Sequence, residues 1–300
     1  MSGNDWIFLV LGLGNVTDSL EPVRALAREL GLEVGEALIQ ERIEGASYVS
    51  ARVLTHGKLA DETAARVRVL ELAERLRCDV VLVSAEEMRR ERRLFVFDMD
   101  STLIQGEVID ELAKMAGVAD RVVAITASAM RGEIEFQESF RRRVALLEGL
   151  QEERARELLR RIPVMPGAER LFAELKRRGV KTAVLSGGFT FFGVYLQERL
   201  GVDWVHANEL DVAGGLVTGA VRGGIVDGAR KAALLKEIAA REGLTLEETV
   251  AVGDGANDLP MLRLAGMGVA FHAKPVVRAE ARYAMTYVGL DGLLELVDWE

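Results

Sequence analysis

The feature that most constrains this chain is a short apolar segment that ends in two carboxylates. Residues 94–97 read Leu-Phe-Val-Phe and are followed directly by Asp98 and, after Met99, by Asp100. A run this short and apolar is typical of a strand buried on both faces inside a parallel sheet. Buried carboxylates need a cation, a proton or several hydrogen-bond donors. In open α/β sheets the ligand crevice lies beyond the carboxyl ends of the strands, where both acids fall, although a capped turn before a helix is the alternative.

The composition excludes several classes of protein. A chain of 300 residues with 49% hydrophobic and 28% charged residues is typical of one large or two modest globular domains. The net charge of -9 argues against a nucleic-acid or anionic-membrane partner. No segment reaches the roughly 20 apolar residues that span a bilayer, and the first residues lack the pattern of a signal peptide. The single Cys78, which we expect to be buried and inert, fits a reducing compartment, so a cytoplasmic location is predicted.

Residues 1–86 form the first predicted unit. Apolar periodicity predicts helices at residues 20–30 and 60–76, and strands at residues 6–13, 32–43, 48–54 and 78–84. A β-α-β-β-α-β order is the ferredoxin-like α+β arrangement. The charged run over residues 86–93 then predicts a solvated connector to a second unit.

Residues 93–300 form the second unit, in which strands and helices alternate. This alternation predicts an α/β fold with a doubly wound parallel sheet. The stretch over residues 107–161 is helical without a strand and is too long for a βα connection, so a helical cap is expected at about residues 105–163. Beyond it we expect a hairpin at residues 210–225, helices at residues 168–178, 189–200, 231–242 and 258–265, and strands at residues 181–185, 204–209, 249–253 and 268–271.

Two further segments place anion-binding groups at strand or helix ends. The Ser186-Gly187-Gly188 turn would present a hydroxyl and backbone N–H groups to an anion, although it is also an ordinary turn. Lys231 is predicted in the first turn of a helix, where a cation opposes the helix dipole. Either a nearby anion stabilises it or it is an exposed surface lysine.

A second buried strand also ends in acids. Asp254 and Asp258 follow residues 249–253 and flank a glycine turn that lacks the calcium-binding EF-hand pattern. All these strand ends would meet at one edge of the sheet. Carboxylates favour a hard cation such as Mg²⁺, whereas serine, lysine and amide groups favour phosphate. The combination predicts phosphoryl transfer.

These four segments, in this order, resemble the four motifs of the haloacid dehalogenase superfamily, and the match over about residues 93–300 extends into the cap, where it resembles phosphoserine phosphatases. The resemblance implies that Asp98 attacks the phosphate to form an aspartyl-phosphate and that Asp100 is the general acid and base. It implies Mg²⁺ held by the carboxylates of Asp98 and Asp254 and the carbonyl of Asp100, with Asp258 supporting the water shell. The implied phosphate ligands are Ser186, the Gly187 amide and Lys231, with Asn257 nearby.

The cap contains an arginine within an apolar stripe. Phe136, Phe140, Arg143 and Leu147 recur at helical spacing on one face, whereas Arg141 and Arg142 point away. A snorkelling arginine is the alternative for Arg143, and a favourable helix-dipole position is the alternative for Glu107.

The resemblance implies that Glu107 binds the ammonium and Arg143 the carboxylate of a phosphorylated amino acid. Met130 and Phe136 resemble the apolar lining of the site in that family. The expected substrate is therefore O-phosphoserine, in the last step of serine biosynthesis.

The first unit resembles ACT-like domains by its element order and position alone. Serine sensing, assembly into a homodimer or a purely structural role all stay open. Two other functions also stay open. One is phosphotransfer to another hydroxyl acceptor such as homoserine, and the other is a serine-responsive regulatory protein, which the filled catalytic positions disfavour.

Overall fold

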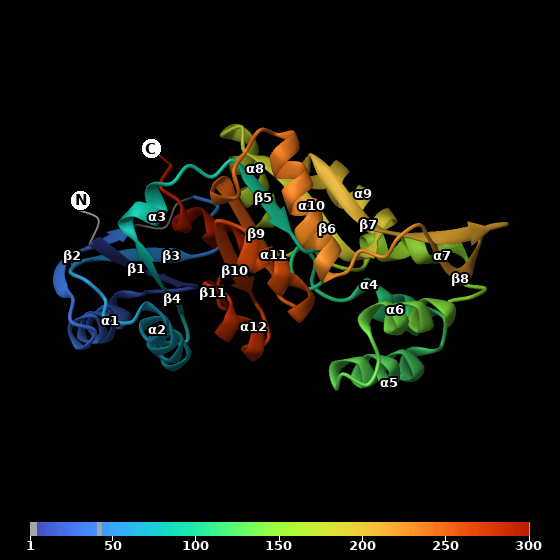
Figure 1. The fold of residues 1–300 in the computed structure, drawn as a ribbon, viewed down its shortest axis with the longest axis horizontal. Coiled ribbons are helices and arrows are strands. Elements are labelled where there is room, and N and C mark those ends of the chain that lie inside the picture. Colours follow the sequence, from blue (N-terminus) through green and yellow to red (C-terminus); the bar gives the residue numbers. More distant parts are fainter. Residues whose placement is uncertain (1–4, 41–43, 300) are drawn as a thin grey trace.

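The computed structural model describes residues 5–40 and 44–299 and contains two sheets, each with its own helices (Figure 1). The first four-stranded sheet has the order β2-β3-β1-β4. Its elements are β1 (Asp5–Gly12), α1 (Thr17–Glu29), β2 (Glu33–Gln40), β3 (Val49–His56), α2 (Glu62–Leu76) and β4 (Asp79–Ser84). The predicted β-α-β-β-α-β order is present, and residues 41–43 of the predicted 32–43 strand lie outside the described residues.

The two faces of the first sheet have different partners. Phe8 and Val10 of β1 pack with helices α1 and α2 through residues such as Val23 and Leu72. The alternate residues of β1, among them Leu9, belong instead to a cluster that includes the C-terminal segment. Because strand side chains alternate between faces, both faces of β1 are buried. The first unit therefore shares its core with the second.

Polar contacts strengthen the junction between the two units. The buried Asp79 accepts hydrogen bonds from the backbone N–H groups of Thr286, Tyr287 and Val288 at 2.5, 3.0 and 3.0 Å. The buried Asp291 similarly accepts the Ser47 N–H at 2.9 Å.

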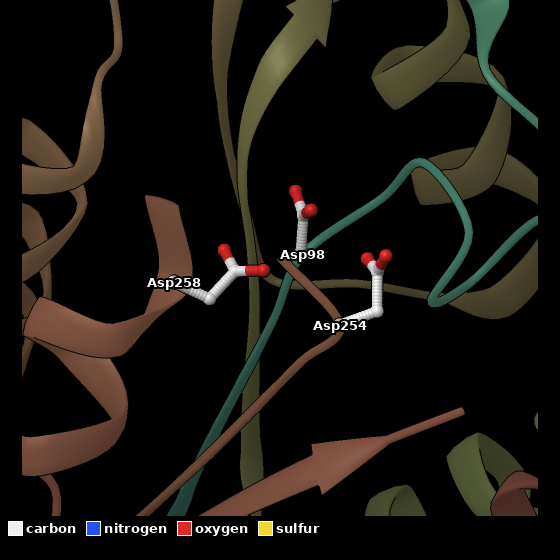
Figure 2. A group of neighbouring side chains, drawn as sticks. All are labelled: Asp98, Asp254 and Asp258. Carbon is white, nitrogen blue, oxygen red and sulfur yellow. The ribbon is translucent and has the colours of Figure 1, made fainter. Parts of the chain in front are cut away.

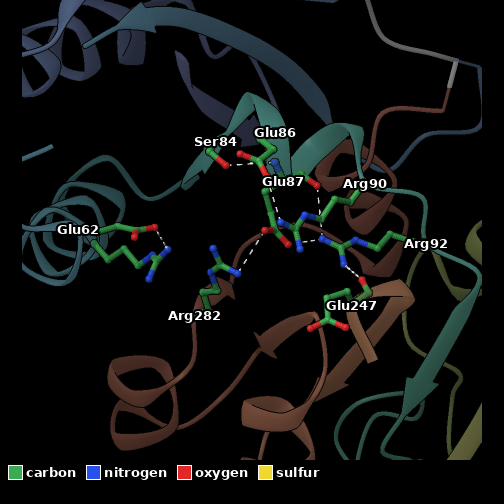
Figure 3. A network of polar contacts seen from close by, with 9 residues as sticks. Glu62, Ser84, Glu86, Glu87, Arg90, Arg92, Glu247 and Arg282 are labelled. Atoms are coloured by element: carbon green, nitrogen blue, oxygen red, sulfur yellow. Dashed lines mark hydrogen bonds and ion pairs between the residues drawn. The ribbon is translucent and has the colours of Figure 1, made fainter. Parts of the chain in front are cut away.

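The prediction of a fully solvated connector over residues 86–93 is wrong. The first part forms the short helix α3 (Ala85–Arg89), and Glu87 and Arg92 are only 5% and 2% exposed. Their side chains form an ion pair, Arg92 also donates to the Glu247 carbonyl, and Arg282 approaches Glu87 at 3.3 Å (Figure 3). Buried charges are tolerated because they are paired and hydrogen-bonded.

The second sheet has seven strands in the order β11-β10-β9-β5-β6-β7-β8. All neighbouring pairs are parallel except β7 and β8, which form a hairpin. The doubly wound α/β prediction is thus confirmed. The hairpin was predicted at residues 210–225, but its first strand is continuous with the predicted strand at residues 204–209. The strands are β5 (Leu94–Phe97), β6 (Lys181–Phe189), β7 (Trp204–Ala213), β8 (Leu216–Arg222), β9 (Thr249–Gly253), β10 (Met267–Phe271) and β11 (Tyr283–Met285).

Helices cover both faces of this sheet. Phe95 and Phe97 of β5 belong to the cluster that contains α8 (Ala168–Arg177) and α9 (Thr190–Leu200), whereas Leu94 and Val96 belong to the cluster of α10 (Gly228–Arg241) and α11 (Leu259–Leu264). The fully apolar strand of the sequence is buried on both faces for this reason. The short elements α12 (Pro275–Glu280) and β11 were not predicted, and 3₁₀ turns occur at residues 246–248, 256–258 and 290–296.

The predicted insert is a helical cap that projects from one end of the sheet (Figure 1). It comprises α4 (Val108–Met115), α5 (Ala119–Met130), α6 (Phe136–Ala145), α7 (Glu152–Arg156) and a 3₁₀ turn at residues 157–160. Its two connections lie side by side, because Ile104 pairs with Val164. Helix α6 ends before Leu147, so that buried residue lies in the following turn. None of the helices in the described part of the chain has the length and apolarity needed to span a bilayer.

Candidate active site

Three carboxylates from two distant segments of the sequence meet where β5 and β9 end (Figure 2). Asp98 follows β5, and its N–H donates to the Val252 carbonyl of β9 at 2.9 Å. Asp98, Asp254 and Asp258 each offer an oxygen, and these oxygens lie within 4.8 Å of one another. The parallel pairing of β5 with β9 therefore brings the two acidic segments together, as their positions at strand ends predicted.

Lys231 is the cation of this cluster. It is fully buried, and its Nζ lies 2.7 Å from Asp98 Oδ1 and 2.7 Å from Asp258 Oδ1. Helix α10 begins at Gly228, so Lys231 lies within its first turn beside two anions rather than on the surface. Asp258 Oδ2 accepts the Gly255 N–H at 2.9 Å. Both oxygens of Asp258 are thus already engaged by the protein.

The acids repel one another beyond what one lysine offsets. Burial, followed by the charge of Asp258, raises the pKa of Asp98 to about 7, although Lys231 opposes the shift. Burial and the charges of Asp98 and Asp258 raise the pKa of Asp254 to about 8, against a hydrogen bond from Thr102. A second cation would relieve this repulsion, and an all-oxygen donor set fits a hard divalent ion such as Mg²⁺.

Asp100 lies in a different environment from Asp98. Its Oδ1 accepts the N–H of Val108, the first residue of α4, at 2.8 Å. Burial, followed by the charges of Glu107 and Asp98, raises its pKa well above the ordinary value. A carboxyl group that retains its proton near neutral pH can act as a general acid.

Residues 186–188 lie beside Asp100, in the irregular end of β6, which extends past the predicted strand end at residue 185 to Phe189. A Cβ placed on Gly188 would come within 2.2 Å of Asp100 Oδ2, so only glycine leaves room for that carboxyl. Ser186 is buried, and its Oγ accepts the Gly188 N–H at 2.8 Å. Asn208, which sequence reasoning missed, donates to the Gly187 carbonyl at 2.8 Å. Its Oδ1 accepts the Val226 N–H at 2.8 Å, so Asn208 ties residue 187 to the segment before α10.

A cavity of about 280 Å³ joins the core to the cap. The predicted site residues that line it are Asp98, Asp100, Glu107, Met130, Phe136, Arg143, Gly187, Asp254 and Asn257. The other three, Ser186, Lys231 and Asp258, are buried and do not line it. Gly188 of the predicted anion-binding segment and Phe140 of the predicted apolar stripe also line it, and the lining residues that were not predicted are Ile109, Asp110, Thr126, Phe189, Gly255 and Lys274. Met130 is 69% exposed, so it lies at the margin of the cavity.

The cap side of the cavity carries charges of both signs. Burial lowers the pKa of Arg143, while the carboxylates of Asp110, Glu107 and Asp100 act in the opposite direction. Arg143 Nε donates only a long 3.4 Å hydrogen bond to the Ser139 carbonyl. Arg142 instead pairs with Glu138 on the exposed side of α6. Asp110 could have been found from the sequence, because it lies one helical turn beyond Glu107.

Comparison with known families identifies the class of protein. The model of the haloacid dehalogenase-like hydrolases matches residues 95–263, and the chain belongs to this family. Over 237 residues it is 46% identical to a phosphoserine phosphatase of Archaeoglobus fulgidus, covering 79% of this chain and 69% of that protein. Over 225 residues it is 49% identical to a phosphoserine phosphatase of Streptomyces coelicolor, covering 75% of this chain but only 55% of that protein.

Solved structures share the fold. The chain is similar along its whole length to a HAD family hydrolase of Salmonella enterica serovar Typhi, with a TM-score of 0.87, 29% identity and 100% of each chain covered. It is also similar to a structure described as a phospho-aspartyl intermediate analogue of phosphoserine phosphatase, with a TM-score of 0.65 and 42% identity over 70% of this chain and 100% of that chain. The first unit is compatible with an ACT-like domain, which these likenesses do not establish.

Proposed function

We propose that the protein hydrolyses O-phospho-L-serine to L-serine and phosphate, the last step of serine biosynthesis. One arrangement carries the proposal. One cavity is lined by Asp98, which pairs with Lys231, at its core end and by Arg143 and Glu107 at its cap end. The phosphoserine phosphatases named above, at 46% and 49% identity, support the same substrate.

The first step is attack by the Asp98 carboxylate on phosphorus. Lys231, whose Nζ lies 2.7 Å from Asp98 Oδ1, favours the charged form of Asp98 that the attack requires. As the bond between phosphorus and the serine oxygen breaks, Asp100 transfers its proton to that oxygen. The products of this step are serine and an aspartyl-phosphate, which splits one difficult hydrolysis into two easier displacements.

The second step is hydrolysis of the aspartyl-phosphate. Asp100, now a carboxylate, accepts a proton from a water molecule that attacks phosphorus. The bond between phosphorus and Asp98 breaks, which releases phosphate and regenerates both carboxyl groups. The same residue is thus acid in one step and base in the next.

Mg²⁺ is the proposed cofactor. The carboxylates of Asp98 and Asp254 and the backbone carbonyl of Asp100 would hold it. Asp258 has both oxygens bound by Lys231 and Gly255, which suits a supporting position. When bound, the ion would offset the negative charges of the carboxylates and the phosphate.

The phosphate and amino-acid ends of the substrate have different proposed partners. The Ser186 hydroxyl, the Gly187 amide and Lys231 would hold the phosphate oxygens, with Asn257 nearby. Arg143 would pair with the substrate carboxylate. Glu107, the N-cap residue of α4, would bind the ammonium, and Asp110 in the first turn of α4 adds a second negative charge. Phe136 and Met130 would cover the apolar part of the substrate.

A substrate panel tests the proposal. Phosphate release should be measured from phosphoserine, phosphothreonine, sugar phosphates and nucleoside monophosphates, with and without Mg²⁺. We expect a clear preference for phosphoserine that requires Mg²⁺. A sugar phosphate or nucleotide hydrolysed faster than phosphoserine would contradict the proposed substrate. Phosphohomoserine formed in the presence of homoserine would indicate phosphotransfer.

A further inference from the structure

One side-chain hydrogen bond links the cap to the core beside the active site. Gln137 Nε2 of α6 donates to Asp227 Oδ2 at 2.7 Å. Within the described part of the chain, it is the only hydrogen bond between a side chain of residues 108–163 and a side chain outside that segment. Neither residue has a role in the proposed chemistry.

Each partner of this bond adjoins a functional group. Asp227 is the N-cap of α10, where its Oδ1 accepts the Arg230 N–H at 2.9 Å, and Lys231 follows in the same turn. Gln137 lies in the first turn of α6, the helix that carries Arg143. Its neighbour Phe136 lies against the proposed phosphate-binding segment, residues 186–188, since a Cβ on Gly187 would be 3.3 Å from the Phe136 ring. The bond therefore fixes the Arg143 helix relative to the Lys231 helix.

The rest of the cap does not depend on this bond. Backbone hydrogen bonds of Val217 with Gly149 and Leu150, and the Ile104–Val164 bridge, also attach the insert. The first contact lies just after α6 and the second at the base of the cap, and the buried Phe140 of α6 also packs against Phe189, with 5.9 Å between the ring centroids. Loss of the Gln137–Asp227 bond should therefore change where α6 sits without unfolding the insert.

We infer that Gln137 and Asp227 form a latch that seats α6 on the core and so positions Arg143 at the correct distance from the phosphate site. The inference rests on the proposed function, which it deepens by naming positioning residues for amino-acid recognition. The latch acts through Arg143. Loss of the latch should therefore lower kcat/KM for a substrate with a carboxylate, and much less for a substrate without one.

Isosteric substitutions test the latch. Gln137→Glu places two carboxylates against each other, and like charges in contact are costly. In Asp227→Asn, two amide groups face each other, so one side chain can still donate a hydrogen bond to the oxygen of the other. The helix cap is also kept, because asparagine caps a helix as well as aspartate does. In the double variant Gln137→Glu/Asp227→Asn, the new amide can donate to the new carboxylate, so the bond re-forms with its direction reversed.

We expect Gln137→Glu to lower kcat/KM for phosphoserine by roughly 10- to 100-fold, the equivalent of about 1.4–2.8 kcal/mol. Asp227→Asn and the double variant should stay within about threefold of the unaltered protein, which is the rescue that a general loss of folding would not give. On p-nitrophenyl phosphate, all three variants should stay within about threefold. Arg142→Gln is the matched control, since it makes the same change in net charge on the exposed side of α6.

Amide hydrogen exchange gives a readout that does not depend on substrate. Residues 136–145 should exchange faster in Gln137→Glu and return to the original rate in the double variant. Equal losses on both substrates, or no rescue in the double variant, would overturn the latch. If the unaltered protein releases no phosphate from phosphoserine while the exchange pattern holds, the proposed substrate fails but the latch stands.

Discussion

At the residue scale, the site holds more carboxylate groups than positive charges that could offset them. Lys231 pairs with Asp98 and Asp258, but Asp254 has only a hydroxyl partner, Thr102. The pKa values of about 7 for Asp98 and about 8 for Asp254 express this repulsion. They also make the stability of the metal-free protein depend on pH.

The sign of that dependence follows from the direction of the shifts. Both folded-state pKa values lie above the roughly 3.9 of an unfolded aspartate. Between these limits the folded state binds more protons than the unfolded state, so the free energy of unfolding falls as pH rises towards 8. In a chelator, we expect the melting temperature to fall between about pH 5.5 and pH 8.5. Mg²⁺ should raise it more at the higher pH, because binding displaces protons.

Thermal melts at both pH values, with Asp254→Asn as the comparison, check this prediction. That variant removes one of the raised carboxyls and should weaken the pH dependence and the Mg²⁺ effect together. A Mg²⁺ stabilisation that is equal at both pH values would show that these carboxyls are not the ligands.

Arg143 supports a second prediction at this scale. A charge-assisted, planar pair with a carboxylate cannot be copied by other side chains. Arg143→Ala should lower kcat/KM for phosphoserine by roughly 2–4 kcal/mol, or about 30- to 1,000-fold. p-Nitrophenyl phosphate, which has no carboxylate, should change far less. Arg142→Ala is the control, and equal losses on both substrates in Arg143→Ala would mean that the arginine only supports its helix.

At the element scale, the end of β6 is limited by the space around Asp100. In Gly188→Ala, the new Cβ would lie within 2.2 Å of Asp100 Oδ2 and within 2.6 Å of the Met99 side chain. Asp100 would have to move, and losing a positioned general acid costs about 10²- to 10⁴-fold in rate. We therefore expect kcat to fall at least about 100-fold while the fold persists.

Gly224→Ala provides the control for this substitution, because nothing lies within 4 Å of a Cβ at that position. Its kcat and circular dichroism spectrum should match those of the unaltered protein. Retention of full activity in Gly188→Ala would show that Asp100 is not constrained as the geometry indicates.

The elements that could be predicted are those with a strong local pattern. The apolar runs at residues 94–97 and 249–253 predicted buried strands followed by acids, and the strands are there. Helical spacing likewise predicted that Arg143 and Arg142 face different ways, and Arg143 alone of the two lines the cavity. Contacts made by side chains that look like ordinary surface residues could not be predicted. Glu87 and Arg92 lie in a charged run, and only the packing of distant elements around them makes them buried. Gln137 and Asn208 likewise acquire their roles from partners far along the chain.

At the scale of the whole molecule, the two units are joined by shared core and by buried acids. Asp79 accepts three backbone N–H groups from the opposite unit. Asp79→Ala would leave these donors buried without an acceptor, at roughly 3–5 kcal/mol of unfolding free energy. Asp18→Ala, an exposed acid in α1, should cost less than about 1 kcal/mol. Urea unfolding of both variants measures the difference, and equal values would show that the junction contributes little.

The central claim is that Asp98 is the nucleophile. The most direct measurement is rapid quenching of the reaction with phosphoserine and Mg²⁺, followed by mass spectrometry of the peptide that contains residues 94–100. The account predicts an acid-stable, hydroxylamine-sensitive phosphate on Asp98 that appears within one turnover and is absent in Asp98→Asn, which should also release no phosphate. Steady phosphate release by Asp98→Asn, or a phosphate on any other residue, would contradict it.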